Sequence, residues 1–396
     1  MAVKDKSITI LGAGIGGLTA AVALARRGAN VTVLDQTPEL ADVGAGIQIT
    51  PNGSAVFEAL GLGRRLHNIS VPLEQVELRD YHSGKSILNL QMNDRRHSNN
   101  NPYLLVHRAD LIDMLAASVK RHGVTLSLGK KITGVAIGFD QATLPVEDGP
   151  QRTTKILIGA DGLRSLTRQS VTVARKPEFT GQVAWRTTIE ARHVPIYDTV
   201  PTATIYAGPG RHLVTYPVRG GTLINIVGVE ARESWAAEGW NHRDDPENLR
   251  NAFSGFAPEV RRLLSLCDDV YLWGLFSHPV AESWHQSGVA ILGDAAHPML
   301  PHLAQGANMA VEDAWVLATE MDRHDDLQHA FAAYQKARKK RVARVVKASR
   351  GNTRIYHMRG GVSRTLVHGG MRLMGRFAPG RAASRFDWLY GVDVTR

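Results

Sequence analysis

The chain of 396 residues contains a single cysteine, Cys267. One thiol cannot form an intrachain disulfide, nor can it supply a metal site built from several cysteines. An apolar run of the roughly 20 residues that a membrane-spanning helix needs is also missing. Residues 1–7 lead directly into a strand-like segment and lack the layout of a secretion signal. We therefore expect a reduced, cytoplasmic protein without a membrane partner.

Length and composition favour a globular protein with more than one core. Hydrophobic residues make up 43% of the chain and charged residues 21%, which excludes wholesale disorder and fibrous repeats. A chain of 396 residues also exceeds one ordinary core. The Gly-x-Ser-x-Gly pattern of α/β-hydrolases and the His-Glu-x-x-His pattern of zinc proteases are both missing. We expect no metal ion.

The positive charge is concentrated near the C-terminal end. The net charge is +10, yet the segment from Gln335 onward holds 16 Lys and Arg against two Asp, so the remainder is slightly acidic. A nucleic-acid-binding domain would carry that charge itself, so we expect no nucleic-acid partner. Val342, Val345 and Val346 interrupt the basic run at helical spacing. We expect a helix with a solvated charged face, or alternatively a field that attracts an anionic substrate or cofactor.

A glycine-rich loop near the start of the chain predicts a dinucleotide site. The loop 12–17 follows a β-rich run, and a helix-forming stretch and a second β-rich run come after it. Gly12 permits a tight turn, Gly14 lets the backbone approach a pyrophosphate, and Gly17 lets the helix pack closely. The predicted loop contacts are Gly12, Gly14, Ile15, Gly16 and Gly17.

An acidic residue completes this unit. Asp35 ends the second β-rich run, where its carboxylate can accept hydrogen bonds from ribose hydroxyls. The helix that follows the glycine loop would direct its amides at the phosphate charge. This unit alone does not separate FAD from NAD(P).

Two later motifs place an acidic residue beside glycine at the end of a strand. The first is Gly159-Ala160-Asp161-Gly162, and the second is Gly293-Asp294-Ala295-Ala296-His297-Pro298. Such strand ends contact cofactors at the carboxyl edge of a sheet. Gln305 to Asn308 then opens a long helix, whose amides and dipole would face developing negative charge.

With these three motifs in this order, the chain resembles the single-component (class A) flavoprotein aromatic hydroxylases. The resemblance covers residues 7–350, and it implies bound FAD. It implies that Asp35 binds the adenosine ribose, that Asp294 binds the ribityl chain and that Arg108 lies along the FAD. It also places the amides of Gly306, Ala307 and Asn308 against the flavin pyrimidine. Asp161 belongs to a motif associated with both FAD and NAD(P)H.

The resemblance also implies the reaction. NADH or NADPH reduces the FAD, O2 adds to form a flavin C4a-hydroperoxide, and oxygen passes to a small aromatic acid or phenol. A salicylate-like substrate, with coupled decarboxylation, is one expectation. Two alternatives stay open: an oxidase or dehydrogenase that inserts no oxygen, and a non-catalytic flavin-binding protein.

Four alternating, β-rich segments between the second and third motifs predict an antiparallel sheet that forms a roof over the flavin. They span residues 183–189, 202–207, 212–218 and 223–229. The period of two in a strand puts His212, Val214 and Tyr216 on one face. The histidine could accept a proton there, and the phenol could orient the substrate.

The same segment resembles hydroxylases of salicylate, 3-hydroxybenzoate and 6-hydroxynicotinate. They carry a similar His-x-x-x-Tyr and a segment like Gly293 to Gly306. The resemblance implies that the Pro301 carbonyl faces the substrate. His302 comes directly after Pro301, as in the 6-hydroxynicotinate hydroxylases. It also implies that the loop Gly44 to Ile49, with Gln48, lies beside the flavin. We assign base or relay roles to His212, Tyr216 and His302, and substrate contacts to these three, Gln48 and Pro301.

The expected fold is α/β, with a Rossmann-type FAD-binding domain, an inserted β-sheet substrate domain and a C-terminal helical region. The FAD-binding domain is assigned to 1–72, 101–175 and 276–334. The substrate domain is assigned to 73–100 and 176–275, and the basic helical region to 335–396. Within that region, residues 359–385 are expected to be mobile or to pack at a subunit contact, and we expect a homodimer.

Overall fold

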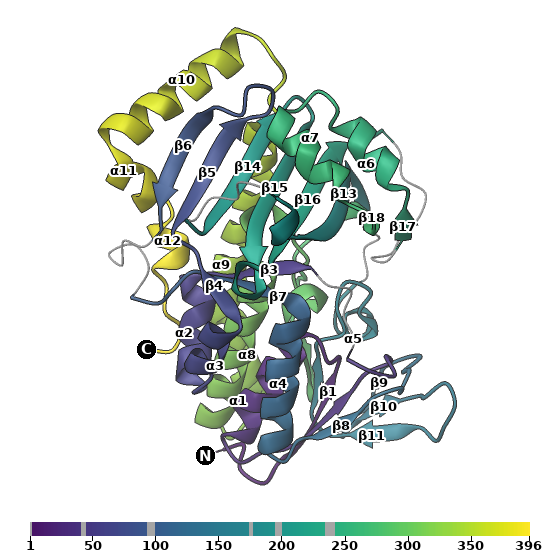
Figure 1. Cartoon of the computed structure of the whole chain (residues 1–396). Helices are drawn as coiled ribbons and strands as arrows, with labels where there is room; N and C mark the ends of the chain where they lie inside the picture. Colours follow the sequence, from purple (N-terminus) through teal and green to yellow (C-terminus); the bar gives the residue numbers. More distant parts are fainter. Residues whose placement is uncertain (1, 41–44, 93–99, 174–176, 195–199, 234–241) are drawn as a thin grey trace.

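The computed structural model describes residues 2–40, 45–92, 100–173, 177–194, 200–233 and 242–396. Gly44, at the start of the predicted flavin loop, lies outside these ranges. The described residues form two main sheets, with helices between and around them (Figure 1). Among them, no helix is both long and apolar enough to cross a bilayer.

The first sheet has six strands in the order β19-β20-β12-β1-β2-β8. Its strands are β1 (Ser7–Leu11), β2 (Asn30–Leu34), β8 (Thr125–Ser127), β12 (Leu157–Gly159), β19 (His285–Gln286) and β20 (Val289–Ile291). All neighbours pair in parallel except β19 and β20. β12 and β20 are buried along their whole length, as expected for parallel strands covered on both faces.

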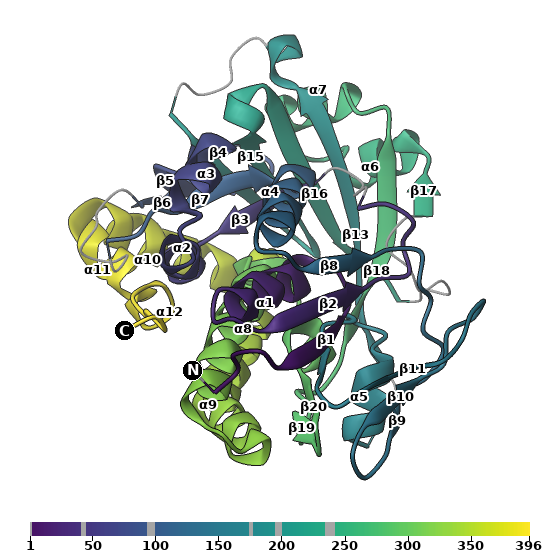
Figure 2. The same ribbon diagram turned by 90° about the horizontal axis from the view of Figure 1, so that it is seen from below.

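Helix α1 (Ile15–Ala25) packs against this sheet and against α4 (Arg108–Arg121) and α8 (Gly306–Arg323), as Figure 2 shows from below. Its sequence is apolar on every side, which fits a helix enclosed by protein. Gly28 follows the helix with φ +86°, the left-handed conformation that glycine adopts without strain. The predicted order of strand, loop, helix and strand is confirmed.

The second sheet has eight strands in the order β17-β18-β13-β16-β15-β14-β5-β6. These strands are β5 (Gln75–Asp80), β6 (Ser86–Gln91), β13 (Glu178–Glu190), β14 (Thr202–Gly208), β15 (Arg211–Val218), β16 (Leu223–Ala231), β17 (His242–Asp244) and β18 (Val270–Ser277). The four predicted roof segments form four of them.

The four predicted roof segments pair antiparallel with one another, as predicted, and the sheet adds one parallel junction outside them. β5 pairs with β14 in parallel. Strands joined by a hairpin must be antiparallel, whereas a long connection allows either direction. More than a hundred residues separate β5 from β14, so their relative direction is not set by a local turn.

The two faces of the eight-stranded sheet have different partners. Helices α6 (Pro246–Ala252) and α7 (Pro258–Ser265) cover one face, where Leu213 is buried among their apolar side chains. Tyr216 and Val218 belong instead to the core shared with the six-stranded sheet. Successive side chains of β15 therefore alternate between the core beneath α6 and α7 and the face toward the six-stranded sheet.

Smaller elements connect the two sheets. β3 (Gly46–Ile49), β4 (Ser70–Pro72) and β7 (Leu104–His107) form one three-stranded sheet, and β9 (Ala136–Ile137), β10 (Ala142–Leu144) and β11 (Arg152–Thr154) form another. The remaining short helices are α2 (Pro51–Ala59), α3 (Gly63–Asn68), α5 (Leu166–Val171), η2 (Ala191–His193), η3 (Arg219–Gly221), η4 (Gly293–Ala295) and η5 (Pro301–Leu303).

The C-terminal region is helical, and together with the two sheets it confirms the expected fold class. It comprises α9 (Leu327–Tyr356), α10 (Val362–Phe377), α11 (Pro379–Ser384) and α12 (Asp387–Tyr390). Val342 and Val345 of α9 are fully buried, as the predicted apolar stripe requires. α10 and α11 lie beside β6 at the edge of the eight-stranded sheet (Figure 1).

Candidate active site

Four parallel strands bring the three sequence motifs to one edge of the six-stranded sheet. Leu11 of β1 pairs with Leu34 of β2 and with Gly159 of β12, and Gly159 pairs with Ile291 of β20. The segments that follow these strand ends hold the glycine loop, Asp35, Asp161 and Asp294. Motifs far apart in the chain therefore meet at the sheet edge where α/β proteins bind their ligands.

The glycines of the loop differ in what surrounds them. A Cβ on Gly12, at φ +107°, would lie 2.3 Å from the Ala160 carbonyl oxygen, and a Cβ on Gly17 would lie 2.0 Å from that of Gly12. Packing is therefore a sufficient reason for glycine at these two positions. A Cβ on Gly14 would meet nothing within 4 Å, although Gly14 caps α1. The helix N-terminus therefore faces open space, which suits a phosphate group.

The carboxylates of Asp35 and Asp161 hold their own loops. The Ala13 amide donates to Asp35 Oδ2 (2.6 Å), which ties the glycine loop to the end of β2. Ser165 Oγ donates to Asp161 Oδ1 (2.5 Å), and the Thr167 amide and hydroxyl donate to Oδ2 (both 3.0 Å). The Asp161 side chain thus caps the start of α5.

Asp294 and Arg108 lie near each other at the same edge. Asp294 is an exposed residue, although desolvation by the surrounding protein raises the pKa of its carboxyl against the opposing influence of His297 and Arg108. An exposed group within densely packed protein is expected where a side chain lines a cleft. Arg108 is the first residue of α4, and its amide donates to the Ala45 carbonyl (2.8 Å).

The start of α8 is fastened to β3. Asn308 Oδ1 accepts from the Thr50 amide (2.9 Å), and its Nδ2 donates to the carbonyls of Gln48 (2.9 Å) and Ala304 (2.8 Å). The Met309 amide donates to the Gln305 carbonyl (2.8 Å). The amides of Gly306, Ala307 and Asn308 precede it in the first turn, where a helix lacks internal acceptors.

The roof places His212, Val214 and Tyr216 on one face of β15, as predicted, toward the first sheet. Tyr216 is buried, and it accepts a hydrogen bond from Gln48 of β3. A Cβ on Gly46 would lie 2.5 Å from the Tyr216 ring. β3 and the roof are therefore in direct contact at Tyr216.

His302 follows Pro301 in the short helix η5 and lies against His212, at the end of the His212–Tyr216 row that is opposite Tyr216. Its ring centroid lies 5.4 Å from that of His212. His302 is 8% exposed, and burial lowers its pKa to about 4, with a smaller contribution from His357. Neither of its ring nitrogens has a hydrogen-bond partner among the described residues. Buried polar atoms without partners are uncommon in native proteins and point to a ligand or water.

The comparisons with known proteins agree with this geometry. The sequence profile of the family described as "FAD binding domain" matches residues 5–349 of the chain. The chain belongs to this family. FAD is therefore its cofactor, and the predicted resemblance to FAD-dependent hydroxylases is confirmed.

Individual relatives are similar over nearly the whole chain. The 3-hydroxybenzoate 6-hydroxylase of Polaromonas naphthalenivorans is 35% identical over 395 residues, covering 98% of this chain and 97% of that protein. The structure of Klebsiella pneumoniae HpxO with FAD and uric acid has a TM-score of 0.84 and 26% identity, and the match covers 97% and 96% of the two chains. A salicylate hydroxylase substrate complex has a TM-score of 0.81 and 25% identity, covering 99% and 97%. The chain is an FAD-dependent monooxygenase.

Two further residues of this FAD-dependent enzyme face the same space and were not predicted. Arg186 of β13 shares a cross-strand row with Val214, through Val227 of β16, and its positive charge acts on Tyr216. Asn225, opposite Tyr216 in the register, has no hydrogen-bond partner for its Nδ2 among the described residues. Strand alternation could have identified both, had the neighbouring strands been registered with β15.

His357 was also missed. It directly follows α9, and its Nε2 lies 2.7 Å from His212 Nδ1. The two residues are 145 positions apart in the sequence. No sequence motif contains both, so the sequence gives no signal that they lie together.

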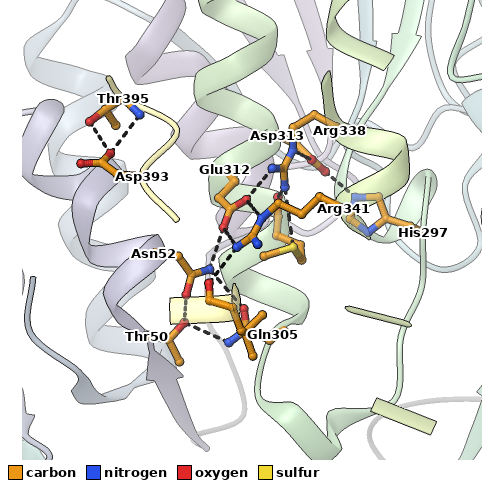
Figure 3. A network of polar contacts seen from close by, with 12 residues as sticks. Thr50, Asn52, His297, Gln305, Glu312, Asp313, Arg338, Arg341, Asp393 and Thr395 are labelled. Carbon is orange, nitrogen blue, oxygen red and sulfur yellow. Dashed lines mark hydrogen bonds and ion pairs between the residues drawn. The ribbon is translucent and has the colours of Figure 1, made fainter. Parts of the chain in front are cut away.

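A buried network of charged side chains joins α8 to α9 (Figure 3). Arg338 is 1% exposed and forms ion pairs with Glu312 and with Asp313, the latter at 2.7 Å. Arg341 Nη2 donates to Glu312 Oε1 (2.8 Å), and Asp313 also pairs with His297. The expectation of a solvated charged face is therefore wrong for Arg338, because α9 turns this side chain toward the acidic pair of α8.

The network extends to the third motif and to the residues around the start of α8. Asn52 Nδ2 donates to Glu312 Oε1 (2.7 Å) and to Gln305 Oε1 (3.2 Å), and Gln305 Nε2 donates to Thr50 Oγ1 (3.0 Å). The Gly293 amide donates to Asp313 Oδ2 (3.1 Å). The charges of α9 thereby position the two segments that flank the start of α8.

Proposed function

We propose that this enzyme hydroxylates a small aromatic acid or phenol, salicylate-like, with NADH or NADPH and O2. One observation carries the proposal. A row of polar side chains on the inner face of the roof, from His212 to Tyr216 with Arg186 and Asn225 beside it, faces the FAD-binding side of the molecule. The relatives named above act on, or are complexed with, ring compounds that include 3-hydroxybenzoate, and a hydroxybenzoate fits a site with these groups.

The residues present suit FAD. The unobstructed Gly14, the exposed Asp294 and the first-turn amides of α8 provide a phosphate site, a hydroxyl acceptor and donors for an anion. FAD, when bound, takes reducing equivalents from the nicotinamide and activates O2 for transfer to the ring. We assign its binding to Gly12, Gly14, Ile15, Gly16, Gly17, Asp35, Gln48, Arg108, Asp161, Asp294, Gly306, Ala307 and Asn308.

The protein must make the substrate ring electron-rich by removing its phenolic proton. A free phenol has a pKa near 10 and histidine one near 6.5, so direct transfer to histidine is uphill by about 5 kcal/mol. Burial lowers the pKa of His212 further, with smaller contributions from His302 and His357. His212 can therefore act as the proton acceptor only where the phenolate is stabilised or the proton is passed on.

Arg186 and Tyr216 supply the stabilising side of the transfer. Burial raises the pKa of Tyr216 above its usual range, so its hydroxyl remains a hydrogen-bond donor to an anion. The guanidinium of Arg186 lies against the Trp273 ring, 4.6 Å from its centroid, on the same face. A carboxylate or phenolate near Tyr216 would gain a charge-assisted partner there. His302 and the Pro301 carbonyl would bound the substrate on the opposite side.

Coupled NADH or NADPH and O2 consumption with a panel of aromatic acids, with identification of the product, tests this function. We expect a hydroxylated product from at least one hydroxybenzoate. His212→Phe should retain FAD and reduce product formation by about 10²- to 10⁴-fold. Reductant oxidation that yields only peroxide with every acid would favour an oxidase, and no stimulation by any acid would favour a non-catalytic flavoprotein. Either result would overturn the proposal.

A pair of glycine variants tests the assigned cofactor loop without using activity. Gly14→Ala should leave the FAD-free protein as stable as wild type, because its Cβ meets nothing within 4 Å, yet weaken FAD binding. Gly17→Ala should destabilise the FAD-free protein itself, because its Cβ would overlap a backbone oxygen. FAD titration by fluorescence and urea unfolding separate the two effects. Unchanged FAD affinity in Gly14→Ala would contradict the assignment.

We also propose the segment boundaries predicted from the sequence, a cytoplasmic location and a homodimer. The pairing of β5 with β14 supports grouping segment 73–100 with 176–275. Leu366, Leu373 and Phe377 of α10 are 70%, 61% and 74% exposed, which suits a subunit contact. Sedimentation velocity of wild type and of the double variant Leu366→Ser, Leu373→Ser tests this assembly. A monomeric wild type would contradict it.

A further inference from the structure

The residue that follows α9 reaches the proposed proton acceptor from behind. His357 Nε2 lies 2.7 Å from His212 Nδ1, and the ring centroids are 4.9 Å apart. His212 is only 2% exposed, whereas His357 is partly exposed. The pair therefore connects a buried imidazole on the roof to the surface.

We propose that His357 is a positioning residue that passes the substrate's proton from His212 to solvent. This inference rests on the hydroxylation proposed above. It assigns a function to a C-terminal residue that lies outside every motif of the cofactor and substrate regions.

Every proton is accounted for in this transfer, and neither imidazole remains charged at its end. The substrate hydroxyl gives its proton to His212 Nε2, and the proton on His212 Nδ1 moves to His357 Nε2. His357 then releases its Nδ1 proton to water. Each ring gains one proton and loses one, so both remain neutral in the exchanged tautomer, and the reverse sequence restores them. A single hydrogen bond between the rings requires one donor and one acceptor nitrogen, which is the arrangement that this transfer uses.

The surroundings favour neutral rings over a stored imidazolium. The titratable groups that contact His212 are His302 from η5, His357, and Tyr356 at the end of α9. Burial is the main cause that lowers the pKa of His212, and burial also lowers that of His357 to about 4. A proton accepted by His212 is therefore expected to leave it, and His357 is the hydrogen-bonded partner through which it can do so.

The end of α9 is held at this place by both sides of the site. Ser349 Oγ donates to the Leu300 carbonyl (2.8 Å), and Asn352 Nδ2 donates to the His302 carbonyl (3.4 Å). The Gly210 amide, at the turn before β15, donates to the His357 carbonyl (3.3 Å). Helix α9 and the residue after it are thus hydrogen-bonded to Leu300 and His302 and to the turn before β15, the strand that carries His212.

The experiment compares His357→Phe with the matched control His368→Phe, a buried histidine of α10 whose electrostatic neighbours are Arg364, Asp80 and Arg372 rather than His212. Both FAD-loaded variants are assayed for hydroxylated product from pH 5 to pH 9, with and without added imidazole. We expect His357→Phe to lose about 10- to 100-fold in turnover, less than His212→Phe, with FAD affinity unchanged. In His357→Ala, which vacates the space of the ring, added imidazole should restore part of the loss, because His357 is partly exposed.

The outcomes separate the two proposals. Turnover by His357→Phe within twofold of wild type at every pH would overturn the relay while leaving hydroxylation intact. A loss that imidazole does not rescue in His357→Ala, together with an unchanged pH profile, would assign His357 a purely structural role and would also overturn the relay. A wild-type enzyme that hydroxylates no aromatic acid would overturn both. Release of protons to an indicator dye, when a phenolic acid binds to the oxidised protein, should slow in His357→Phe and not in the control.

Discussion

Two buried clusters of ionisable groups meet helix α9, and they are built in opposite ways. In the α8–α9 network, Arg338 faces two carboxylates, Arg341 donates to both oxygens of Glu312, and Asn52 donates to Oε1 of the same carboxylate (Figure 3). In the histidine cluster, the His212 ring contacts the rings of His302 and His357, and both ring nitrogens of His302 lack a hydrogen-bond partner among the described residues.

The difference shows how one helix can serve stability with one part and chemistry with another. Opposite charges keep Glu312 and Asp313 ionised, with their pKa values lowered despite burial. Burial without a counter-charge instead keeps the histidines neutral. A paired, fully hydrogen-bonded group has little tendency to exchange its proton, whereas a neutral imidazole with an open nitrogen can do so.

Removing one partner of the charge network should have the largest effect on stability. Arg338→Met would leave two buried carboxylates with fewer positive partners, and we expect a loss of about 3–5 kcal/mol in the free energy of unfolding. Urea denaturation measures the change. Lys340→Met, at an exposed position of the same helix, is the control and should change stability by less than about 0.5 kcal/mol. Equal effects in both variants would contradict the contrast between the clusters.

The histidine cluster should control stability at mildly acidic pH. The pKa of His302 is about 4 in the folded protein and near 6.5 when unfolded, so the unfolded chain binds more protons between these values. Folding stability should therefore fall as the pH drops from 6.5 to 4, by up to about 3 kcal/mol for His302. His302→Gln should flatten this part of the stability profile. A wild-type slope in the variant would argue against neutral burial.

The charge network should act in a lower pH window. The pKa of Asp313 is about 2 in the folded protein and near 3.9 when unfolded, so its contribution is complete above pH 4 and is lost as the pH falls toward 2. We expect a loss of about 2 kcal/mol over this window, which Asp313→Asn should remove. His302→Gln is the control, and it should keep the slope below pH 4. The same urea series at each pH provides the measurement.

The smallest effect is expected at a partly exposed pair that holds α10, whose side chains are 13% and 21% exposed. Arg364 lies 2.8 Å from Asp80 and over the Tyr81 ring, 4.8 Å from its centroid. Arg364→Met should cost about 1 kcal/mol, because solvent screens the pair. Hydrogen exchange of α10 should increase, while Arg381→Met, at an exposed position, should leave it unchanged. A loss as large as that of Arg338→Met would show that exposure does not govern these pairs.

Much of the fold could be predicted because its causes are local. Glycines between a strand and a helix, an acidic residue at a strand end, and alternation along β15 depend on neighbours within a few positions. The three motifs, the helix start at Gly306 and the shared face of His212 and Tyr216 follow from such patterns. The roles of the assigned site residues and the segment boundaries stay predictions until the proposed experiments are done.

Partners across the chain could not be predicted in this way. Arg338 and Lys340 stand two positions apart in one basic run, yet one is buried against carboxylates of α8 and the other is exposed. Arg186 and Asn225 join the site only through the register of three strands.

The glycine loop, the acidic strand ends, the periodicity of the roof strands and the family of the chain can all be inferred from the amino-acid sequence. The burial of particular charges of α9 and the contact between His357 and His212 arise only when the helices and sheets pack together. Periodicity and turn chemistry act over a few residues. A pairing across 145 positions, by contrast, depends on how whole helices and sheets pack against one another.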